Sequence, residues 1–253
     1  MPNASEPKSS SEPPRGDQPA ASESAPAPAP ARPESSWSWP NFTRNALIIG
    51  AAIALAVWFW DQGIKPNIIP KNFGIVTDGE IYRSGELTPR TTEMVVREHG
   101  IRTIVDFGAH EPGSSEEEIA QRTADALGVT RIVFDLEGDA TGDPNAYVEA
   151  LRIMTDPDQR PVLVHCAAGA QRTGCGVALY RSIVEGVPDE EALAEATKYR
   201  HDPEDNPRLP AMYHRYRDAI EDAFRNGGSI PFTPGPFDEY TPPEPPNSLR
   251  TDD

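Results

Sequence analysis

Apolar and polar positions follow two different patterns along the chain. Between Ala46 and Trp60 every residue is uncharged and apolar or small, in the run ALIIGAAIALAVWFW. From residue 61 to about residue 228, short apolar runs alternate with longer segments that carry helix caps and stops. This alternation predicts one α/β domain with a mainly parallel central sheet flanked by helices.

The boundaries of the expected elements follow from their cap and turn residues. The strands are expected at residues 80–84, 102–107, 131–136 and 161–165. The helices are expected at residues 91–99, 114–127, 144–154, 173–185, 189–200 and 210–225. Gly100 and Gly128 each end a helix, and Ser114 with Ser115 caps one. The continuous run at 161–165, PVLVH, is typical of a strand covered on both faces.

The apolar run predicts a transmembrane helix at residues 42–62. Its fifteen uncharged residues would form a helix of about 22 Å, and counting from Phe42 extends it to about 28 Å, close to a hydrocarbon core. That extension includes Arg44, whose side chain can reach the interface. A signal peptide is the main rival, but its n-region would be about 44 residues long and net acidic, which is unusual. A buried core helix is the other alternative, although no amphipathic face is visible.

The positive-inside rule leaves the orientation of this helix open. Arg32 and Arg44 precede the run, and Lys65 and Lys71 follow it. The expected location is therefore a membrane, single-pass, with the side of the domain undecided.

Proline is concentrated at the two ends of the chain. Ten of the 28 prolines lie in residues 1–40 and seven in residues 229–253. Such segments favour extended, unpacked structure. The predicted organisation is a disordered Pro/Ala/Ser-rich tail at 1–41, a transmembrane helix at 42–62, the α/β domain at 63–228 and a Pro-rich disordered tail at 229–253.

Charge and cysteine content exclude several classes of protein. The formal net charge is −17, which argues against a nucleic-acid partner. Two cysteines cannot form a disulfide-rich scaffold. The histidines outside the loop described below show no metal-ligand spacing, so we expect no metal and no cofactor.

Residues 165–174, HCAAGAQRTG, form the loop from which chemistry can be inferred. A buried strand enters this loop and a helix leaves it, so backbone N–H groups and the helix N-terminus can together bind an anion. Gly169 permits the tight turn, and the planar fork of Arg172 can bind two phosphate oxygens. The candidate phosphate-binding residues are Ala167, Ala168, Gly169, Ala170, Gln171 and Arg172.

Cys166 lies where the strand ends, beneath these donors, and its thiolate should be stabilised there. A thiolate in that position can attack phosphorus and form a cysteinyl-phosphate. Thr173 can donate its hydroxyl to the sulfur, and His165 is expected to hold the loop through its ring N–H. Together with Arg172 these are the candidate catalytic residues of the loop.

The loop resembles the signature of cysteine-dependent protein tyrosine and dual-specificity phosphatases. Cys166 is followed by five residues, then Arg172 and Thr173, with His165 before them and Gly174 after. The flanks at 72–76, 81–85 and 101–107 resemble a bacterial branch close to the atypical dual-specificity phosphatases, over about residues 70–200. The resemblance implies a protein-tyrosine-phosphatase-like fold. Rhodanese-type sulfurtransferases typically have a loop one residue shorter, so the spacing favours phosphate transfer.

This chemistry also needs an acid to protonate the leaving oxygen. The resemblance implies an Asp in the loop after the preceding strand, some thirty residues before the Cys. Asp135, Asp139 and Asp143 lie 31, 27 and 23 residues before Cys166. Asp135 is expected within the strand and Asp143 at a helix N-cap, whereas Asp139 stands between two glycine-containing stretches of a mobile loop. Asp139 is therefore the preferred candidate, with the other two left open.

Three other residues have competing interpretations. For Arg83, in the flank that resembles the family, a role at the site and a surface salt bridge are equally open. Asp106 ends a strand near the edge where ligands bind in α/β folds, but a structural hydrogen-bond acceptor is expected. Cys175 is expected to be a buried thiol rather than a redox partner of Cys166.

Three functions fit the sequence to different extents. The first is a membrane-anchored phosphatase acting on phosphotyrosine, with dual specificity open, so that the partner is a phosphorylated protein or a small phosphomonoester. The second is a phosphoinositide or inositol-phosphate phosphatase. Relatives with polyanionic substrates often carry a Lys where Ala170 stands, and residues 61–228 hold 18 Lys+Arg against 30 Asp+Glu, which disfavours it. The third is a non-catalytic phosphate-binding module, disfavoured because both Cys166 and Arg172 are present.

Overall fold

The computed structural model describes residues 39–239. Most of the two predicted tails, residues 1–38 and 240–253, lies outside this range. The first described element is helix α1, Trp39–Phe59, which continues as one π turn, Trp60–Ile64, and one 3₁₀ turn, Lys65–Asn67.

Within residues 39–239 one helical segment is long and apolar enough to cross a membrane. It covers the 26 residues Phe42–Asn67, and none of it is buried by the rest of the chain. Large apolar side chains such as Leu47, Ile53 and Trp58 are more than half exposed. The predicted anchor at 42–62 therefore coincides with a helix that leaves its apolar surface uncovered.

The sheet of the domain has five strands in the order β1-β2-β5-β3-β4. Their bounds are β1 Gly74–Thr77, β2 Ile81–Ser84, β3 Thr103–Asp106, β4 Thr130–Val133 and β5 Val162–His165. Strand β1 pairs antiparallel with β2, and every other pair is parallel. The three inner strands β2, β5 and β3 are buried along their whole length, as the continuous apolar run of β5 predicted.

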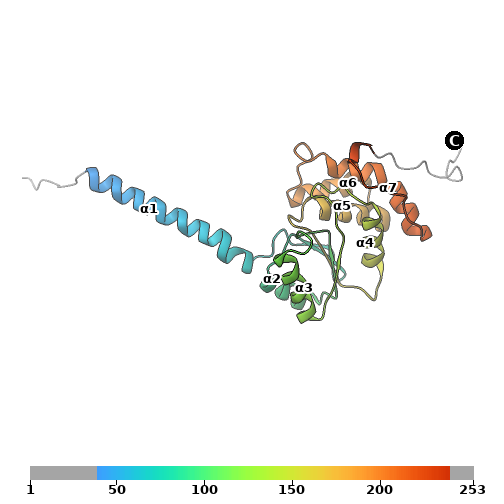
Figure 1. Ribbon diagram of the computed structural model, residues 1–253, viewed down its shortest axis with the longest axis horizontal. Helices are drawn as coiled ribbons and strands as arrows, with labels where there is room; N and C mark the ends of the chain where they lie inside the picture. Colours follow the sequence, from blue (N-terminus) through green and yellow to red (C-terminus); the bar gives the residue numbers. More distant parts are fainter. Residues whose placement is uncertain (1–38, 240–253) are drawn as a thin grey trace, which may run out of the picture. The chain divides into compact units, whose positions relative to one another are not determined.

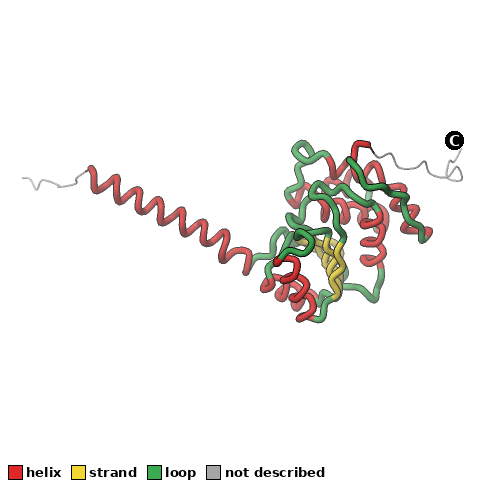
Figure 2. Tube along the Cα trace, in the orientation of Figure 1, coloured by secondary structure: helices red, strands yellow, loops and turns green. Residues whose placement is uncertain are grey.

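Helices cover both faces of this sheet (Figure 1, and the strands between them in Figure 2). Helices α2, Pro89–His99, and α3, Ser115–Leu127, cover one face. Helices α4, Asn145–Thr155, α5, Gln171–Leu179, α6, Asp189–Glu195, and α7, Arg208–Asn226, form the layer on the other side. Each face has its own buried apolar cluster.

Side-chain caps and left-handed residues set the ends of α2 and α3. The Thr88 and Ser114 side chains accept the N–H groups of Thr91 and Glu117. Gly100 and Gly128 end the helices with φ of 65° and 68°, a conformation that glycine adopts without strain. The expected fold class, a mainly parallel sheet flanked by helices, is confirmed.

Several expected boundaries differ from the structure. The expected strand 131–136 ends at Val133, so Asp135 lies in the following loop and not in the strand. Strand β1 was not expected. It has four residues and pairs only with β2, at the edge of the sheet. The expected helix 173–185 begins at Gln171 and changes to a π turn after Leu179.

The start of the expected C-terminal tail packs against the domain. Ile230 is buried, and its backbone exchanges two hydrogen bonds with the Asn145 side chain. Phe237 packs on the apolar cluster, with the Arg215 guanidinium 3.9 Å from its ring centroid. Proline content alone did not predict these contacts. Ile230 and Phe237 are two apolar side chains that hold this short proline-rich segment on the domain.

One buried ion pair joins the adjacent strands β3 and β4. The Asp106 carboxylate accepts hydrogen bonds from Nε and Nη2 of Arg131 at 3.0 and 2.7 Å. Both side chains are almost fully buried, with exposed fractions of 0% and 3%. Removing one partner of such a pair leaves a buried charge without compensation.

We therefore expect Asp106→Asn to destabilise the domain by about 3–5 kcal/mol, because Arg131 then remains charged and unpaired. For a domain of this size the thermal unfolding midpoint should fall by roughly 6–20 °C. The matched control is Glu93→Gln, which breaks an exposed ion pair with Arg97 and should cost less than about 1 kcal/mol.

The difference in stability between wild type and Asp106→Asn should depend on pH. Burial alone would raise the pKa of Asp106, but the facing His165, the Ala109 N–H and Arg131 together hold that pKa below its ordinary value. The stabilisation is thus complete above about pH 4 and is lost as the pH falls further. Equal unfolding midpoints for Asp106→Asn and wild type at pH 7 would contradict a stabilising role of the pair.

Candidate active site

The loop after β5 lies at the centre of the sheet's carboxyl edge. Strand β5 runs between β2 and β3 in parallel, and His165 is in register with Ser84 on one side and Asp106 on the other. The residues that follow β2 and β3 therefore flank the loop 166–170. Ligands bind at this edge in open parallel sheets.

Three consecutive carbonyl groups of the loop are held from outside. The Ala167 oxygen accepts the Glu86 N–H at 3.1 Å. The Ala168 oxygen accepts Nδ2 of Asn72 at 3.1 Å, and the Gly169 oxygen accepts Nη2 of Arg83 at 2.7 Å. In a planar trans peptide the N–H points opposite to the C=O.

The N–H groups of Ala168, Gly169 and Ala170 consequently point to the inner side of the loop. The Gly169 N–H donates to Sγ of Cys166 at 3.2 Å, which places the sulfur on that side. The arrangement matches the predicted anion cradle, with backbone donors converging above the cysteine.

Two glycines allow the loop to pack directly on the chain after β2. Gly169 has φ of 71°, and a Cβ added there would lie 2.5 Å from the Gly85 nitrogen. A Cβ at Gly85 would lie 2.8 Å from the Ala168 oxygen. The tight turn expected at Gly169 is present, and the equal need for glycine at position 85 shows that this is a backbone-to-backbone contact.

Cys166 and Thr173 are both buried beneath the loop. Cys166 has an exposed fraction of 1% and Thr173 of 0%. Among the residues that the structure describes, the Thr173 hydroxyl has no hydrogen-bond partner. The bond expected from this hydroxyl to the Cys166 sulfur is therefore not formed in this structure.

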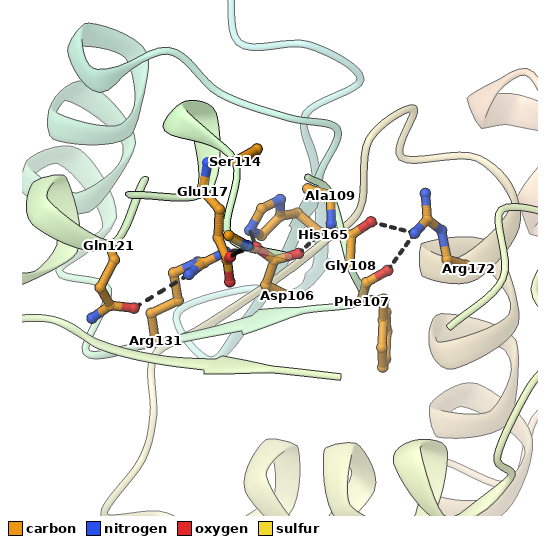
Figure 3. A network of polar contacts seen from close by, with 11 residues as sticks. Asp106, Phe107, Gly108, Ala109, Ser114, Glu117, Gln121, Arg131, His165 and Arg172 are labelled. Atoms are coloured by element: carbon orange, nitrogen blue, oxygen red, sulfur yellow. Dashed lines mark hydrogen bonds and ion pairs between the residues drawn. The ribbon is translucent and has the colours of Figure 1, made fainter. Parts of the chain in front are cut away.

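Arg172 joins the start of α5 to the ends of the neighbouring strands. Its Nη1 donates to the carbonyl oxygen of Phe107 at 2.8 Å and to that of Gly108 (Figure 3). The same nitrogen donates to the carbonyl oxygen of Leu136 at 3.2 Å. Gly108 leaves room for the guanidinium, since a Cβ there would lie 3.1 Å from Nη1. The side chain thus lies against the segments that follow β3 and β4.

His165 belongs to a polar network behind the loop (Figure 3). Its Nε2 lies 3.4 Å from Oδ2 of Asp106, whose other oxygen accepts the Ala109 N–H at 2.8 Å. Burial lowers the pKa of His165 below its ordinary value, and the nearby Asp106 carboxylate only partly opposes this. The ring therefore contacts β3 and not the loop, which corrects the expected ring N–H bond to the loop.

The structure also settles the environments of Asp106 and Cys175. Asp106 is the structural hydrogen-bond acceptor that the sequence predicted, because all of its contacts are internal. Cys175 is a free thiol on α5 with no exposed surface, and burial raises its pKa to about 12. The prediction of a buried thiol is confirmed.

Arg83 is not at the surface, so the salt-bridge alternative for this residue is wrong. The side chain is completely buried, and its guanidinium lies 3.7 Å from the centroid of the Tyr199 ring. Arg83 thus joins three parts of the chain that are far apart in sequence, namely β2, the loop and the turn after α6.

The three candidate acids have different surroundings. Oδ1 of Asp139 accepts the N–H and the hydroxyl of Thr141 at 3.0 and 2.6 Å. Oδ1 of Asp143 accepts the N–H and side chain of Asn145, one residue beyond the helix start that was expected at Pro144. Asp135 is exposed, directly before Leu136, whose carbonyl contacts Arg172.

Sequence analysis missed the residues that support the loop from a distance. Asn72, Glu86 and Tyr199 contact it or its neighbours across 81 to 127 positions of sequence, and only the flank at 72–76 drew attention to any of them. Arg131 was also missed, because its partner Asp106 lies 25 residues earlier on another strand.

Comparison with known proteins places these observations in a family. A family model described as "DSP-PTPase phosphatase fused to NAD+ Kinase" matches residues 72–210, more than half of the chain. The inositol diphosphatase DSP3 of Arabidopsis thaliana is 31% identical over 119 residues, which cover 45% of this chain and 55% of that protein. The match therefore spans little more than half the length of this curated relative.

Two solved structures share the fold. The core catalytic domain of the PP-IP phosphatase SIW14 from Saccharomyces cerevisiae has a TM-score of 0.50 and 20% identity, covering 63% of this chain and 95% of that one. TpbA of Pseudomonas aeruginosa has a TM-score of 0.50 and 22% identity, covering 62% and 92%. The sheet and its central loop are thus those of the protein tyrosine phosphatase fold, and the chain belongs to the DSP-PTPase family that the matching model describes.

Proposed function

We propose that the chain is a membrane-anchored, cysteine-dependent phosphatase that hydrolyses phosphomonoesters, with phosphotyrosine in proteins as its substrate. The observation that carries this proposal is the loop 166–170, whose carbonyl groups are tied outward while its N–H groups converge on the side of the Cys166 sulfur. Such a loop fits the three non-bridging oxygens of a phosphoryl group.

The reaction follows from these positions in two steps. The Cys166 thiolate attacks phosphorus, the bond from phosphorus to the ester oxygen breaks, and an acid gives that oxygen its proton. Water then attacks the cysteinyl-phosphate, the S–P bond breaks, and the same carboxylate takes a proton from the water. Arg172 and the loop N–H groups stabilise the charge of the phosphoryl oxygens in both steps.

Asp139 is our candidate for the acid and later base. Its loop is linked to the site, because the Leu136 carbonyl that begins it accepts a hydrogen bond from Arg172. Among the described residues the carboxylate of Asp139 accepts hydrogen bonds from Thr141, two residues away, and interacts with Arg208 electrostatically, whereas that of Asp143 accepts from the first residue of α4. A local turn of this kind can reorient at little cost, while movement of Asp143 would disrupt the helix start.

The side chains of the loop favour a substrate of low charge. Positions 167, 168 and 170 are all alanine, so the loop itself carries no cation besides Arg172. Residues 61–228 contain 18 Lys+Arg and 30 Asp+Glu, and this balance repels a polyanion more than a phosphotyrosyl group. Inositol diphosphates are the second candidate, supported by the names of relatives such as DSP3.

The membrane anchor is proposed from α1 and from the short connection that follows it. The proposed anchor ends at residue 62, and Asn72 binds the Ala168 oxygen of the loop. The ten residues between them span at most about 36 Å. With residues 42–62 across a bilayer, the site therefore works within that distance of the end of the anchor, where phosphorylated segments of membrane proteins are within reach.

The first experiment measures hydrolysis of a phosphotyrosyl peptide by the full chain in detergent, with a chelator present. We expect turnover by wild type and a loss of at least about 10³-fold in Cys166→Ser, since that variant lacks the nucleophile. Cys175→Ala is the matched control and should keep its activity, because this thiol is buried on α5 and its hydrogen-bond partner is Tyr147 and not a residue of the loop.

An inositol diphosphate and inositol phosphates are tested in parallel with the same variants. A higher kcat/KM for the diphosphate than for the peptide would replace phosphotyrosine by the second candidate. A folded wild-type chain that hydrolyses none of these compounds would refute the enzymatic proposal.

The acid is identified by comparing Asp139→Asn, Asp135→Asn and Asp143→Asn. We expect Asp139→Asn alone to lower kcat for the phosphotyrosyl peptide by about 10²–10³-fold and to remove the decline of kcat at high pH, which reports loss of the acid's proton. The loss should be smaller for para-nitrophenyl phosphate, whose leaving group needs less protonation. An equal or larger effect of either other variant would assign the acid to that residue instead.

Membrane insertion is tested by alkaline extraction of membranes that carry the full chain. Wild type should stay with the lipid, whereas a variant with Ile49→Arg and Ile53→Arg should be released, since each charge at the centre of a spanning helix costs roughly 3 kcal/mol. Ile75→Arg changes an equally exposed isoleucine of the domain and should stay with the lipid. Release of wild type would refute the anchor and leave the catalytic proposal unaffected.

A further inference from the structure

Arg83 is a buried arginine on the outer side of the candidate phosphate loop, where the carbonyl groups point. It is the third residue of β2 and is in register with Val164, two residues before Cys166. Its Nη2 donates to the Gly169 oxygen at 2.7 Å, and its guanidinium stacks at 3.7 Å from the centroid of the Tyr199 ring. The side chain has no exposed surface.

The charge of this guanidinium is not balanced by a carboxylate. Within residues 39–239 no Asp or Glu oxygen lies within 4 Å of it, and its Nε and Nη1 have no hydrogen-bond partner. The Tyr199 hydroxyl, Glu195 and the Cys166 sulfur act on it electrostatically in this order, and Glu195 is itself paired with Arg181 at 2.9 Å. Burial lowers the pKa of Arg83 to about 10, which still leaves it charged at neutral pH.

An uncompensated buried cation is costly and is retained where it serves a purpose. Arg131 provides the contrast within the same domain, because its guanidinium is equally buried but fully paired with Asp106. The Cys166 thiolate and a bound phosphate are anions that lie across the loop from Arg83 and can interact with its charge.

We propose that Arg83 is a positioning residue that supplies a second positive charge to the site from the outer side of the loop. This charge stabilises the Cys166 thiolate and the phosphoryl group, which lie on the inner side. This inference rests on the proposed function for the phosphate but concerns the thiolate independently of turnover. Arg83 differs from Arg172 in acting through the loop and not by contact with substrate.

The path of this effect is the peptide group between Gly169 and Ala170. Arg83 donates a charge-assisted hydrogen bond to its carbonyl, and a hydrogen bond on the C=O side polarises the N–H on the other side. That N–H, of Ala170, points to the inner side of the loop. The guanidinium also acts directly through the low-dielectric interior, where charges interact more strongly than in water.

Asn72 offers a matched control for a purely mechanical role. Its Nδ2 holds the neighbouring carbonyl, of Ala168, at 3.1 Å, and thus ties the same loop outward without any charge. If Arg83 only fixed the loop, loss of either side chain would have the same consequence.

Other titratable and charged groups surround the pair and remain unchanged in every variant. They come from β5, α4, α5, the π turn Tyr180–Val184 that follows α5, α6 and the turn after α6: His165, Tyr147, Arg172, Cys175, Arg181, Glu195 and Tyr199. A shift that appears only when the charge at position 83 is removed can therefore be assigned to Arg83.

The test follows alkylation of Cys166 by iodoacetamide as a function of pH, in the full chain in detergent, with the modified peptide identified by mass. The variants are Arg83→Met, Arg83→Gln, Arg83→Lys and Asn72→Ala. We expect the pH of half-maximal reactivity to rise by about one unit in Arg83→Met and Arg83→Gln, a roughly tenfold slower reaction on the acidic side. Arg83→Lys should remain close to wild type because it keeps the charge, whereas Asn72→Ala, which removes a neutral hydrogen bond from the same loop, should give a clearly smaller shift than the neutral Arg83 variants.

Each other result has a defined meaning. Arg83→Gln keeps a polar but uncharged side chain in the buried position, so it replaces Arg83→Met if the latter fails to fold. A wild-type pH profile in the folded neutral variants, or an equal shift in Asn72→Ala, would overturn the proposal. If the shift is found while wild type hydrolyses no phosphomonoester, the charge effect stands and the proposed function fails.

Discussion

The backbone contact between residues 84–86 and the loop 166–170 determines how the site is built. A loop can bind a phosphoryl group through its N–H groups only if its carbonyl groups are satisfied elsewhere. Here three consecutive carbonyls are bonded to a main-chain N–H, an amide and a guanidinium. This requires that β2 end beside the loop, which the parallel pairing of β2 with β5 ensures, and that positions 85 and 169 be glycine.

The opposite side of the loop is organised around charges and not around backbone contact. Asp106 closes the turn after β3 through the Ala109 N–H, and this turn presents the Phe107 and Gly108 carbonyls to Arg172. The same carboxylate pairs with Arg131 and faces His165. One buried acidic group thus fixes a strand end, the residue before the nucleophile and the backbone that Arg172 contacts.

The sequence predicted the elements and the central loop because both depend on local patterns. Apolar runs, caps and glycine stops identify strands and helices, and the spacing from Cys166 to Arg172 identifies the loop. The supports of the loop could not be predicted in this way. Asn72 and Arg83 contact it across 96 and 86 positions, and only the pairing order of the strands brings them together. Likewise the position of Asp135 outside β4 depends on where pairing with β3 stops, which no local pattern specifies.

The distribution of charge in the domain links these features to substrate choice. Residues 61–228 are net acidic, with 30 Asp+Glu against 18 Lys+Arg, while two arginines contact the loop or lie beside it, Arg83 on its outer side and Arg172 at the start of α5. Positive charge is thus placed next to the phosphate loop within a segment whose net charge is negative. The proposed preference for phosphotyrosine rests on this balance of charge, whereas the names of relatives such as DSP3 support inositol diphosphates as the second candidate.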